Sequence, residues 1–254
     1  MKDLREITEK ALYFMQDTRL NIVPDLGSMR IFDAPLICVA SSADPLFVKL
    51  KEPEVIGPHH MTPVEWLPGA QAVISYFLPF SQRVRESNYS EGNPSIEWLY
   101  GRIEGQMCNS ALSRYLIDEF RKYGVEAIAP SLDKRFFITN KRSNWSERHV
   151  AYIAGLGTFN LSKSLITQKG CAGRFGSVIV NRKYDATPRP YKDIYEYCTN
   201  CGACIDRCPP RAITEKGKNN NICSGFVDGI RKKFTPRYGC GKCQTAVPCE
   251  YCIP

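Results

Sequence analysis

The chain has 254 residues, 43% hydrophobic and 24% charged, which is ordinary for a globular protein with one large domain or a medium domain and an appendage. Its net charge is +8, and +6 of this lies in residues 182–254, where 13 Lys or Arg residues accompany 7 Asp or Glu residues. No apolar run reaches the about eighteen residues of a membrane-spanning helix, and the charged segment Met1–Leu20 is unlike a secretory signal. We therefore expect a cytoplasmic protein without a membrane segment.

The first half of the chain predicts alternating helices and strands. Apolar residues recur at helical spacing over Lys2–Asn21 and Ser95–Tyr123, which we expect to be helices. Three short apolar segments are typical of buried strands: Ala34–Ala40, Ala70–Phe80 and Val125–Ala129. The proline-rich stretch 51–68 is expected to be a loop with room for a short helix near Val64.

The next segment adds one helix and two strands. A helix is expected over Trp145–Ala154, capped at its start by Ser146 and stopped by Gly155. Strands are expected at Ser164–Thr167 and Phe175–Asn181. Helices and strands alternate without the regular βαβ period of parallel sheets, so the sequence predicts an α+β fold.

A proline-containing linker divides the chain. Two prolines within Asp185–Lys192 mark the predicted boundary between a domain of residues 1–184 and a domain of residues 185–254. Nine of the 12 cysteines lie beyond this boundary. The second domain is therefore the place to look for a metal site.

Its cysteines follow a metal-binding pattern. The run Cys198 to Pro209 reads C-x2-C-x2-C-x3-C-P, the bacterial ferredoxin spacing in which three cysteines bind one 4Fe-4S cluster and the fourth binds another. The run therefore requires a second cluster. Because proline suits the first turn of a helix, we also expect a helix after Cys208 that carries this cysteine toward the second cluster.

Two sets of four cysteines follow. Cluster 1 is assigned Cys198, Cys201, Cys204 and Cys249, with Cys252 as the alternative to Cys249. Cluster 2 is assigned Cys208, Cys223, Cys240 and Cys243. The remaining cysteines, Cys38, Cys108 and Cys171, are interpreted as small buried apolar residues.

Other uses of the cysteines agree less well with the sequence. A disulfide framework is unexpected without a secretory signal. A zinc site made by the last two C-x2-C pairs would leave Cys208 and Cys223 without a cluster. The thiolates of two clusters would also offset much of the local positive charge, so nucleic acid is not required, and the small basic patch Arg231–Lys233 fits a solvated face.

The residues before the cysteines carry a family resemblance. Ala154-Gly155-Leu156-Gly157, Leu165-Ile166 and Arg174-Phe175-Gly176-Ser177 precede the two-cluster module, in an order that resembles the epoxyqueuosine reductases, relatives of the corrinoid reductive dehalogenases. The resemblance covers roughly residues 95 to 250. It implies a nitroreductase-like first domain that binds cobalamin against the ferredoxin module, with one cluster passing electrons to the cobalt.

The same resemblance implies the cofactor contacts and the partners. The candidate cofactor-binding residues are Gly157, Thr158, Lys163, Leu165, Arg174, Gly176 and Ser224. A redox donor such as ferredoxin or flavodoxin is expected to supply electrons, and a small molecule is a possible substrate.

The chain departs from the family pattern in three ways. The family's proton-donating aspartate lies in an Asp-Thr-Gly-Pro segment, whereas this chain has Lys141-Arg142-Ser143-Asn144 there and no carboxylate until Glu147. The family's Gly-Trp-Ile-Gly-Lys-Asn segment is replaced by Gly157-Thr158-Phe159-Asn160-Leu161-Ser162. The helical-repeat domain that helps longer members hold tRNA is expected to be absent. We therefore expect a substrate other than epoxyqueuosine in tRNA.

Three residues near this gap are candidates for acid–base catalysis: Glu147, His149 and Tyr152. Each has a structural interpretation as well, since Glu147 suits the first turn of a helix and the other two suit simple packing. The pair His59-His60 is not expected to bind a metal ion, because adjacent side chains point apart.

Three functions remain open. The first is a corrinoid- and iron–sulfur-dependent reductase. The second is an electron-transfer or corrinoid-binding partner without substrate turnover, which the missing aspartate favours. The third is a flavin-dependent reductase, because nitroreductase-like domains commonly hold flavin, although no phosphate-binding motif supports it.

Overall fold

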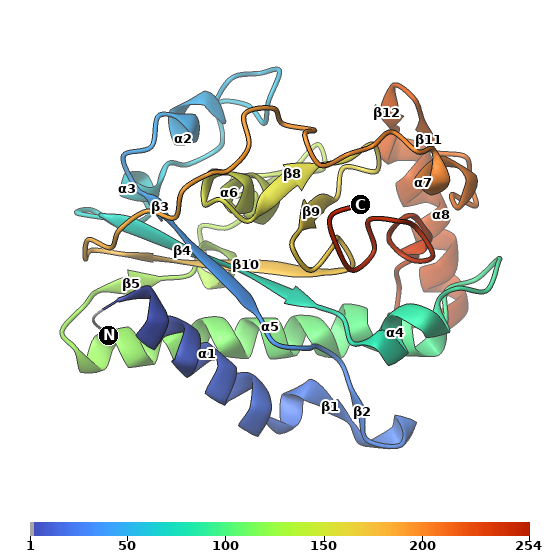
Figure 1. Ribbon diagram of the computed structural model, residues 1–254, viewed down its shortest axis with the longest axis horizontal. Coiled ribbons are helices and arrows are strands. Elements are labelled where there is room, and N and C mark those ends of the chain that lie inside the picture. Colours follow the sequence, from blue (N-terminus) through green and yellow to red (C-terminus); the bar gives the residue numbers. More distant parts are fainter. Residues whose placement is uncertain (1–2) are drawn as a thin grey trace.

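The structure is a computed structural model that describes residues 3–254, and its centre is a four-stranded antiparallel sheet (Figure 1). The strand order is β3 (Leu36–Ser41), β4 (Ala72–Pro79), β10 (Gly173–Val180) and β5 (Ala127–Ile128). β10 pairs with β4 along its whole length, whereas β5 pairs with Ile179 and Val180. Helices and an antiparallel sheet together form the mixed architecture expected from the sequence.

Helices cover both faces of the sheet (Figure 1). α1 (Leu4–Asp17) and α5 (Ile96–Lys122) pack on the face that presents Val178 and Val180 of β10. Three shorter helices lie on the opposite face, which presents Ile179: α2 (Leu46–Lys49), α3 (Pro63–Trp66) and α6 (Glu147–Ile153). Because side chains alternate between the faces of a strand, every residue of β4 is buried under one layer or the other.

The helices and strands predicted before residue 181 are confirmed, with boundaries shifted by a few residues. β9 (Leu165–Thr167) is the strand expected near Ser164, and α3 is the short helix near Val64. α1 begins after Asp3, whose side chain accepts a hydrogen bond from the Glu6 N–H at 2.9 Å. The start of the first predicted helix, Lys2, lies outside the described residues.

The helix expected after Cys208 is wrong. The chain turns at Pro209 and Pro210 and enters β11 (Ile213–Thr214), which forms a hairpin with β12 (Gly217–Lys218). A residue before proline is disfavoured in helical conformation, so Pro210 prevents a helix from starting at Pro209. A short helix, α7 (Ala203–Asp206), instead precedes Cys208, and the unpredicted α8 (Asn220–Phe234) carries Cys223.

Smaller elements complete the fold. Three further ribbons are β1–β2 (Ile22–Val23, Met29–Arg30), β6–β7 (Ile138–Thr139, Arg142–Ser143) and β8 (Gly157–Phe159) paired with β9. The remaining helix is α4 (Gln82–Ser87), and the 3-10 turns are Arg19–Asn21, Pro24–Leu26, Pro130–Leu132 and Lys242–Gln244. Within residues 3–254 no helix combines the length and apolar character needed to cross a bilayer.

The linker 185–192 is fixed to the edge of the sheet. The Thr187 N–H donates to the Val39 oxygen at 2.9 Å, and the Val39 N–H donates to Thr187 Oγ1 at 3.0 Å. Arg189 forms an ion pair with Asp44 at 2.6 Å. The division of the chain at residue 184 stays a prediction, since this segment is packed along β3 rather than free of it.

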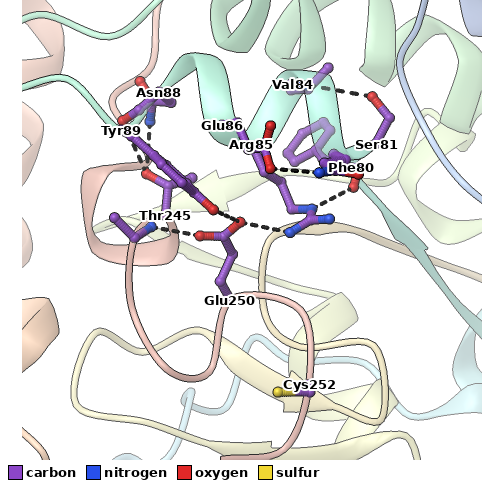
Figure 2. A network of polar contacts seen from close by, with 12 residues as sticks. Phe80, Ser81, Val84, Arg85, Glu86, Asn88, Tyr89, Thr245, Glu250 and Cys252 are labelled. Atoms are coloured by element: carbon purple, nitrogen blue, oxygen red, sulfur yellow. Dashed lines mark hydrogen bonds and ion pairs between the residues drawn. The ribbon is translucent and has the colours of Figure 1, made fainter.

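Buried polar contacts dock the end of the chain onto α4 (Figure 2). Glu250, with 1% of its side chain exposed, lies 2.7 Å from Arg85 Nη1 and accepts hydrogen bonds from the Tyr89 hydroxyl at 3.0 Å and the Ala246 N–H at 2.6 Å. A side chain at Gly170 would place its Cβ 2.2 Å from the Glu250 oxygen. Glycine there, with φ of +72°, therefore lets the two backbones approach each other.

We predict that Glu250→Gln lowers the free energy of unfolding by about 3 kcal/mol, because it leaves the largely buried Arg85 charge without its partner. The measurement is anaerobic chemical denaturation. The control is Glu86→Gln on the exposed face of α4, which should change stability by less than about 0.5 kcal/mol. Equal effects of the two substitutions would contradict the role given to Glu250.

Candidate functional site

Four cysteines surround a small cavity at the start of the second domain. Cys198, Cys201, Cys204 and Cys249 all line it. Cys252 is not part of this lining; its Sγ lies 3.7 Å from the Pro248 oxygen, apart from the Glu250 network (Figure 2). The geometry therefore favours Cys249 as the fourth ligand of cluster 1.

Residues of the first domain position this group. Thr158 Oγ1 accepts a hydrogen bond from the Tyr197 N–H at 2.9 Å, directly before Cys198. The side-chain amide of Asn160 lies 3.6 Å from Cys249 Sγ. Cys171 is buried, as predicted, but it also contacts this site: its N–H donates to the Cys249 oxygen at 2.9 Å and the two sulfurs are 3.8 Å apart.

The other four cysteines form a second group beside the first. Burial, together with the nearby thiols of Cys243, Cys223 and Cys208, raises the pKa of Cys240 to about 12. Cys243 also lies close enough to Cys204 of the first group to raise the pKa of that thiol. The cysteines assigned to cluster 2 are thus near enough to act on one another, and their division into two sets stays a prediction.

A 4Fe-4S cluster and a single metal ion require different arrangements of ligands. Within residues 3–254, no three His, Cys, Asp or Glu side chains gather closely enough to hold a single metal ion. A 4Fe-4S cluster instead takes its four thiolates from around a cube. Cluster binding would also keep these thiols deprotonated, since a thiol that coordinates a metal loses its proton.

A cavity of about 560 Å³ lies between the sheet and the segment 238–241, a size typical of ligand pockets. Its walls come from the start of β10, the first half of α5, the segment 145–148 at the start of α6, and the segment 238–241 of the second domain. Cys240 of the second group belongs to this last wall. A predicted cluster ligand therefore forms part of one side of the cavity.

The cavity exists because the edge of β10 is uncovered. β5 pairs with Ile179 and Val180, and within the described residues no strand continues this pairing along 173–178. The second domain can come close because Gly241 packs on the Trp98 ring, where a Cβ would lie 1.9 Å from the indole. A larger residue at position 241 would push this wall away.

Glu147 is the acid–base candidate that lines the cavity. Its Oε2 accepts a hydrogen bond from the Ser177 hydroxyl at 2.7 Å, and Ser177 in turn accepts one from the Trp145 indole at 2.9 Å. Its Oε1 is buried and has no partner among residues 3–254. Burial raises the pKa of Glu147 to about 7, against the lowering effect of the Ser177 hydrogen bond. The carboxyl group therefore forms a hydrogen bond with β10 of the sheet and does not cap its own helix.

The other two candidates lie outside the lining of the cavity. His149 bonds through Nδ1 to Ser146 Oγ at 2.7 Å, and burial lowers its pKa to about 4. The Tyr152 ring packs between Phe159 and Tyr191. Their catalytic roles stay predictions, and the contacts are those of packed residues.

The candidate cofactor contacts divide in the same way. Leu165 and Arg174 line the cavity. Gly157, Thr158, Lys163, Gly176 and Ser224 are not among its lining residues. Gly157 and Thr158 pair with β9, Gly176 packs on Tyr76, and Ser224 accepts a hydrogen bond from Lys141 at 2.7 Å.

Sequence reasoning missed several residues of the cavity wall. Arg102 and Gln106 lie one turn apart on α5, and Tyr238 faces them from the second domain. Arg102 and Gln106 are four residues apart and each follows a glycine, Gly101 or Gly105, so the sequence does place two polar side chains on one face of this helix. The prediction of the helix used only its apolar positions.

Comparison with known proteins identifies relatives of the chain. A family model described as a 4Fe-4S binding domain matches residues 191–214. An epoxyqueuosine reductase of Staphylococcus aureus is 32% identical over 193 residues, which cover 72% of this chain and 49% of that protein. Epoxyqueuosine reductases of Bacillus cereus and Bacillus subtilis are each 26% identical, over 72% and 78% of this chain and 49% and 52% of theirs.

The chain belongs to the epoxyqueuosine reductase family. It spans about half the length of these curated relatives.

Solved structures show the same fold. An epoxyqueuosine reductase from Streptococcus thermophilus has a TM-score of 0.58 at 17% identity, covering 97% of this chain and 65% of that one. An epoxyqueuosine reductase with an epoxyqueuosine-modified tRNA stem loop has a TM-score of 0.52 at 19% identity, covering 98% and 66%. A reductive dehalogenase described with a B12-dependent mechanism has a TM-score of 0.54 at 11% identity, covering 76% and 27%.

We predict that Cys249→Ala loses cluster 1, which is half of the about eight iron atoms expected for two clusters, whereas Cys252→Ala keeps them. The cavity lining is the reason, since Cys249 shares it with the other three ligands. Iron analysis and electron paramagnetic resonance of anaerobically purified protein make the comparison. Loss of iron in the Cys252 variant alone would show the assignment to be wrong.

A second prediction concerns the pH dependence of stability. The pKa of Glu147 is raised from 4.5 to about 7 by folding, so the unfolded chain releases this proton at lower pH. The wild type should therefore lose stability relative to Glu147→Gln as the pH rises from about 4.5 to about 7, and the difference should be constant above that. Denaturation midpoints across this range, with Glu86→Gln as the control, measure it. Parallel curves for wild type and Glu147→Gln would contradict a protonated Glu147.

Proposed function

We propose that this protein is a reductase in which two 4Fe-4S clusters deliver electrons to a corrinoid bound in the cavity, where a substrate is reduced. The observation that carries the proposal is that Cys240 and Glu147 line the same cavity. Under this proposal one wall contains a cluster ligand, Cys240, and another contains a proton donor, Glu147. The sheet domain would be the nitroreductase-like part of this arrangement.

The two groups of cysteines support a path for electrons. The Cys198, Cys201, Cys204 and Cys249 group lies next to the second group through Cys243. The second group reaches the cavity through Cys240. Electrons from a donor such as ferredoxin or flavodoxin would therefore pass from cluster 1 to cluster 2 and then to the cavity.

The lining of the cavity fits a corrinoid. Aromatic rings of Phe80, Trp98 and Phe175 offer flat apolar surfaces, and Gln106 and Gln244 offer hydrogen-bonding amides at its edges. A corrinoid supplies a reducible cobalt centre, which the side chains of this protein do not have. The reductive dehalogenase with the same fold, described as B12-dependent, gives this choice further support.

Glu147 would hold the proton. Because the Trp145 indole can only donate, Ser177 accepts its hydrogen bond and directs its own hydroxyl hydrogen to Glu147 Oε2. The carboxyl proton is therefore held on Oε1, the oxygen without a partner. A pKa of about 7 keeps a substantial protonated fraction at neutral pH, as general acid catalysis requires. Glu147 would thus replace the aspartate that this chain lacks.

The substrate is proposed to be a compound that accepts electrons and a proton in this cavity. One relative is described with an epoxyqueuosine-modified tRNA stem loop, so that stem loop is a substrate to test against small molecules. We expect small molecules to be reduced and the stem loop not to be.

Anaerobic purification followed by extraction of the bound small molecules tests the proposal. We expect about eight iron atoms per chain and a corrinoid that binds at about one per chain. Flavin in place of the corrinoid, or about four iron atoms, would contradict it. If the corrinoid is reduced but no compound in a substrate screen is turned over, the protein is an electron-transfer partner and not an enzyme.

A further inference from the structure

Two arginines meet in the cavity away from Glu147. Arg174 of β10 donates from Nη2 to the Arg102 carbonyl of α5 at 3.1 Å, and its Nη1 lies 3.5 Å from Gln106 Oε1. Arg102 donates from Nη2 to the Tyr238 hydroxyl at 2.7 Å and lies 4.6 Å above the centre of that ring. Both arginines line the cavity.

Within residues 3–254 no carboxylate forms an ion pair with either Arg102 or Arg174. The carboxylate on the adjacent turn, Glu104, is paired with Arg237. A further cation, Arg231, lies 4.2 Å above the same Tyr238 ring. The region around Tyr238 is therefore strongly positive.

The surroundings of Arg174 disfavour its charge. The groups whose charges act on Arg174 are Arg102 and Tyr238, whereas the arginine that faces a cluster thiol, Cys243, is Arg148. Burial, together with the nearby charge of Arg102, lowers the pKa of Arg174 to about 9. Its Nε is also buried without a hydrogen-bond partner. Two half-buried cations side by side are unfavourable unless an anion joins them.

We propose that Arg102 and Arg174 form a subsite that binds a phosphate group of the molecule in the cavity. Guanidinium groups present paired N–H donors that match phosphate oxygens, and the negative charge of a phosphate group offsets part or all of the positive charge of the two arginines. Gln106 and Tyr238 hold the two guanidinium groups in place. The inference rests on the proposed function in one respect, which is that the cavity is the ligand site. The phosphate comes either from the nucleotide part of the corrinoid or from the substrate.

The first test is binding of inorganic phosphate to the anaerobically purified, cluster-loaded protein. Arg174→Gln and Arg102→Gln should each weaken it about tenfold or more, because a charge-assisted contact is lost. Arg114→Gln removes the same charge from an exposed position of α5 and should change it less than about twofold. Equal affinity of wild type and Arg174→Gln for phosphate would overturn the proposal. It would also be overturned if the wild type bound no phosphate and the two proteins bound cobalamin and cobinamide with the same affinities.

The second test identifies the source of the phosphate. Cobalamin carries a phosphate in its nucleotide, and cobinamide lacks that nucleotide. If Arg174→Gln binds cobalamin more weakly than the wild type does but binds cobinamide equally well, the phosphate belongs to the cofactor. If the substitution changes the binding of neither corrinoid, the phosphate belongs to the substrate. Wild type that binds neither corrinoid contradicts the proposed function but still leaves the phosphate measurement to decide this inference.

Discussion

The buried ion pair between Glu250 and Arg85 fixes the arrangement on which both candidate sites depend. Glu250 follows Cys249 directly, so the contact that docks the end of the chain on α4 also sets the position of one predicted cluster ligand. Backbone contacts at Gly170 and Cys171 hold the same segment against the sheet domain. A carboxylate so deeply buried is costly unless it is paired, which ties the two domains together.

This docking produces a cavity with three chemically different walls. The open edge of β10 leaves space, and the second domain closes it with Cys240 and Tyr238. Glu147 offers a proton on one side, and the pair of Arg102 and Arg174 offers positive charge on another. Such a division suits a reaction that needs an electron source, a proton source and an anchored ligand at one place.

Local patterns in the sequence were enough for much of the fold and for a proposed set of cluster ligands. The spacing from Cys198 to Cys208 reflects how a short loop wraps a cluster, and apolar periodicity located the main helices and strands. The predicted helix after Cys208 does not form, because Pro210 disfavours a helical conformation at Pro209.

The remaining site could not be predicted because it depends on contacts between distant residues. The environment of Glu147 is made by Ser177, 30 positions further along the chain on another element. The choice between Cys249 and Cys252 depends on Asn160 and Cys171, which precede Cys249 by 89 and 78 residues. The arginine pair joins α5 to β10 over 72 positions. Spacing within a motif carries no information about such contacts.

The central claim is that electrons reach the cavity through Cys240. It is tested most directly by anaerobic reduction of the cluster-loaded protein with cobalamin bound, with the cobalt followed by visible absorption. The account predicts rapid reduction of cobalt in the wild type, and slow reduction in Cys240→Ala, even though that variant still binds cobalamin. Equally fast reduction in both proteins would contradict it.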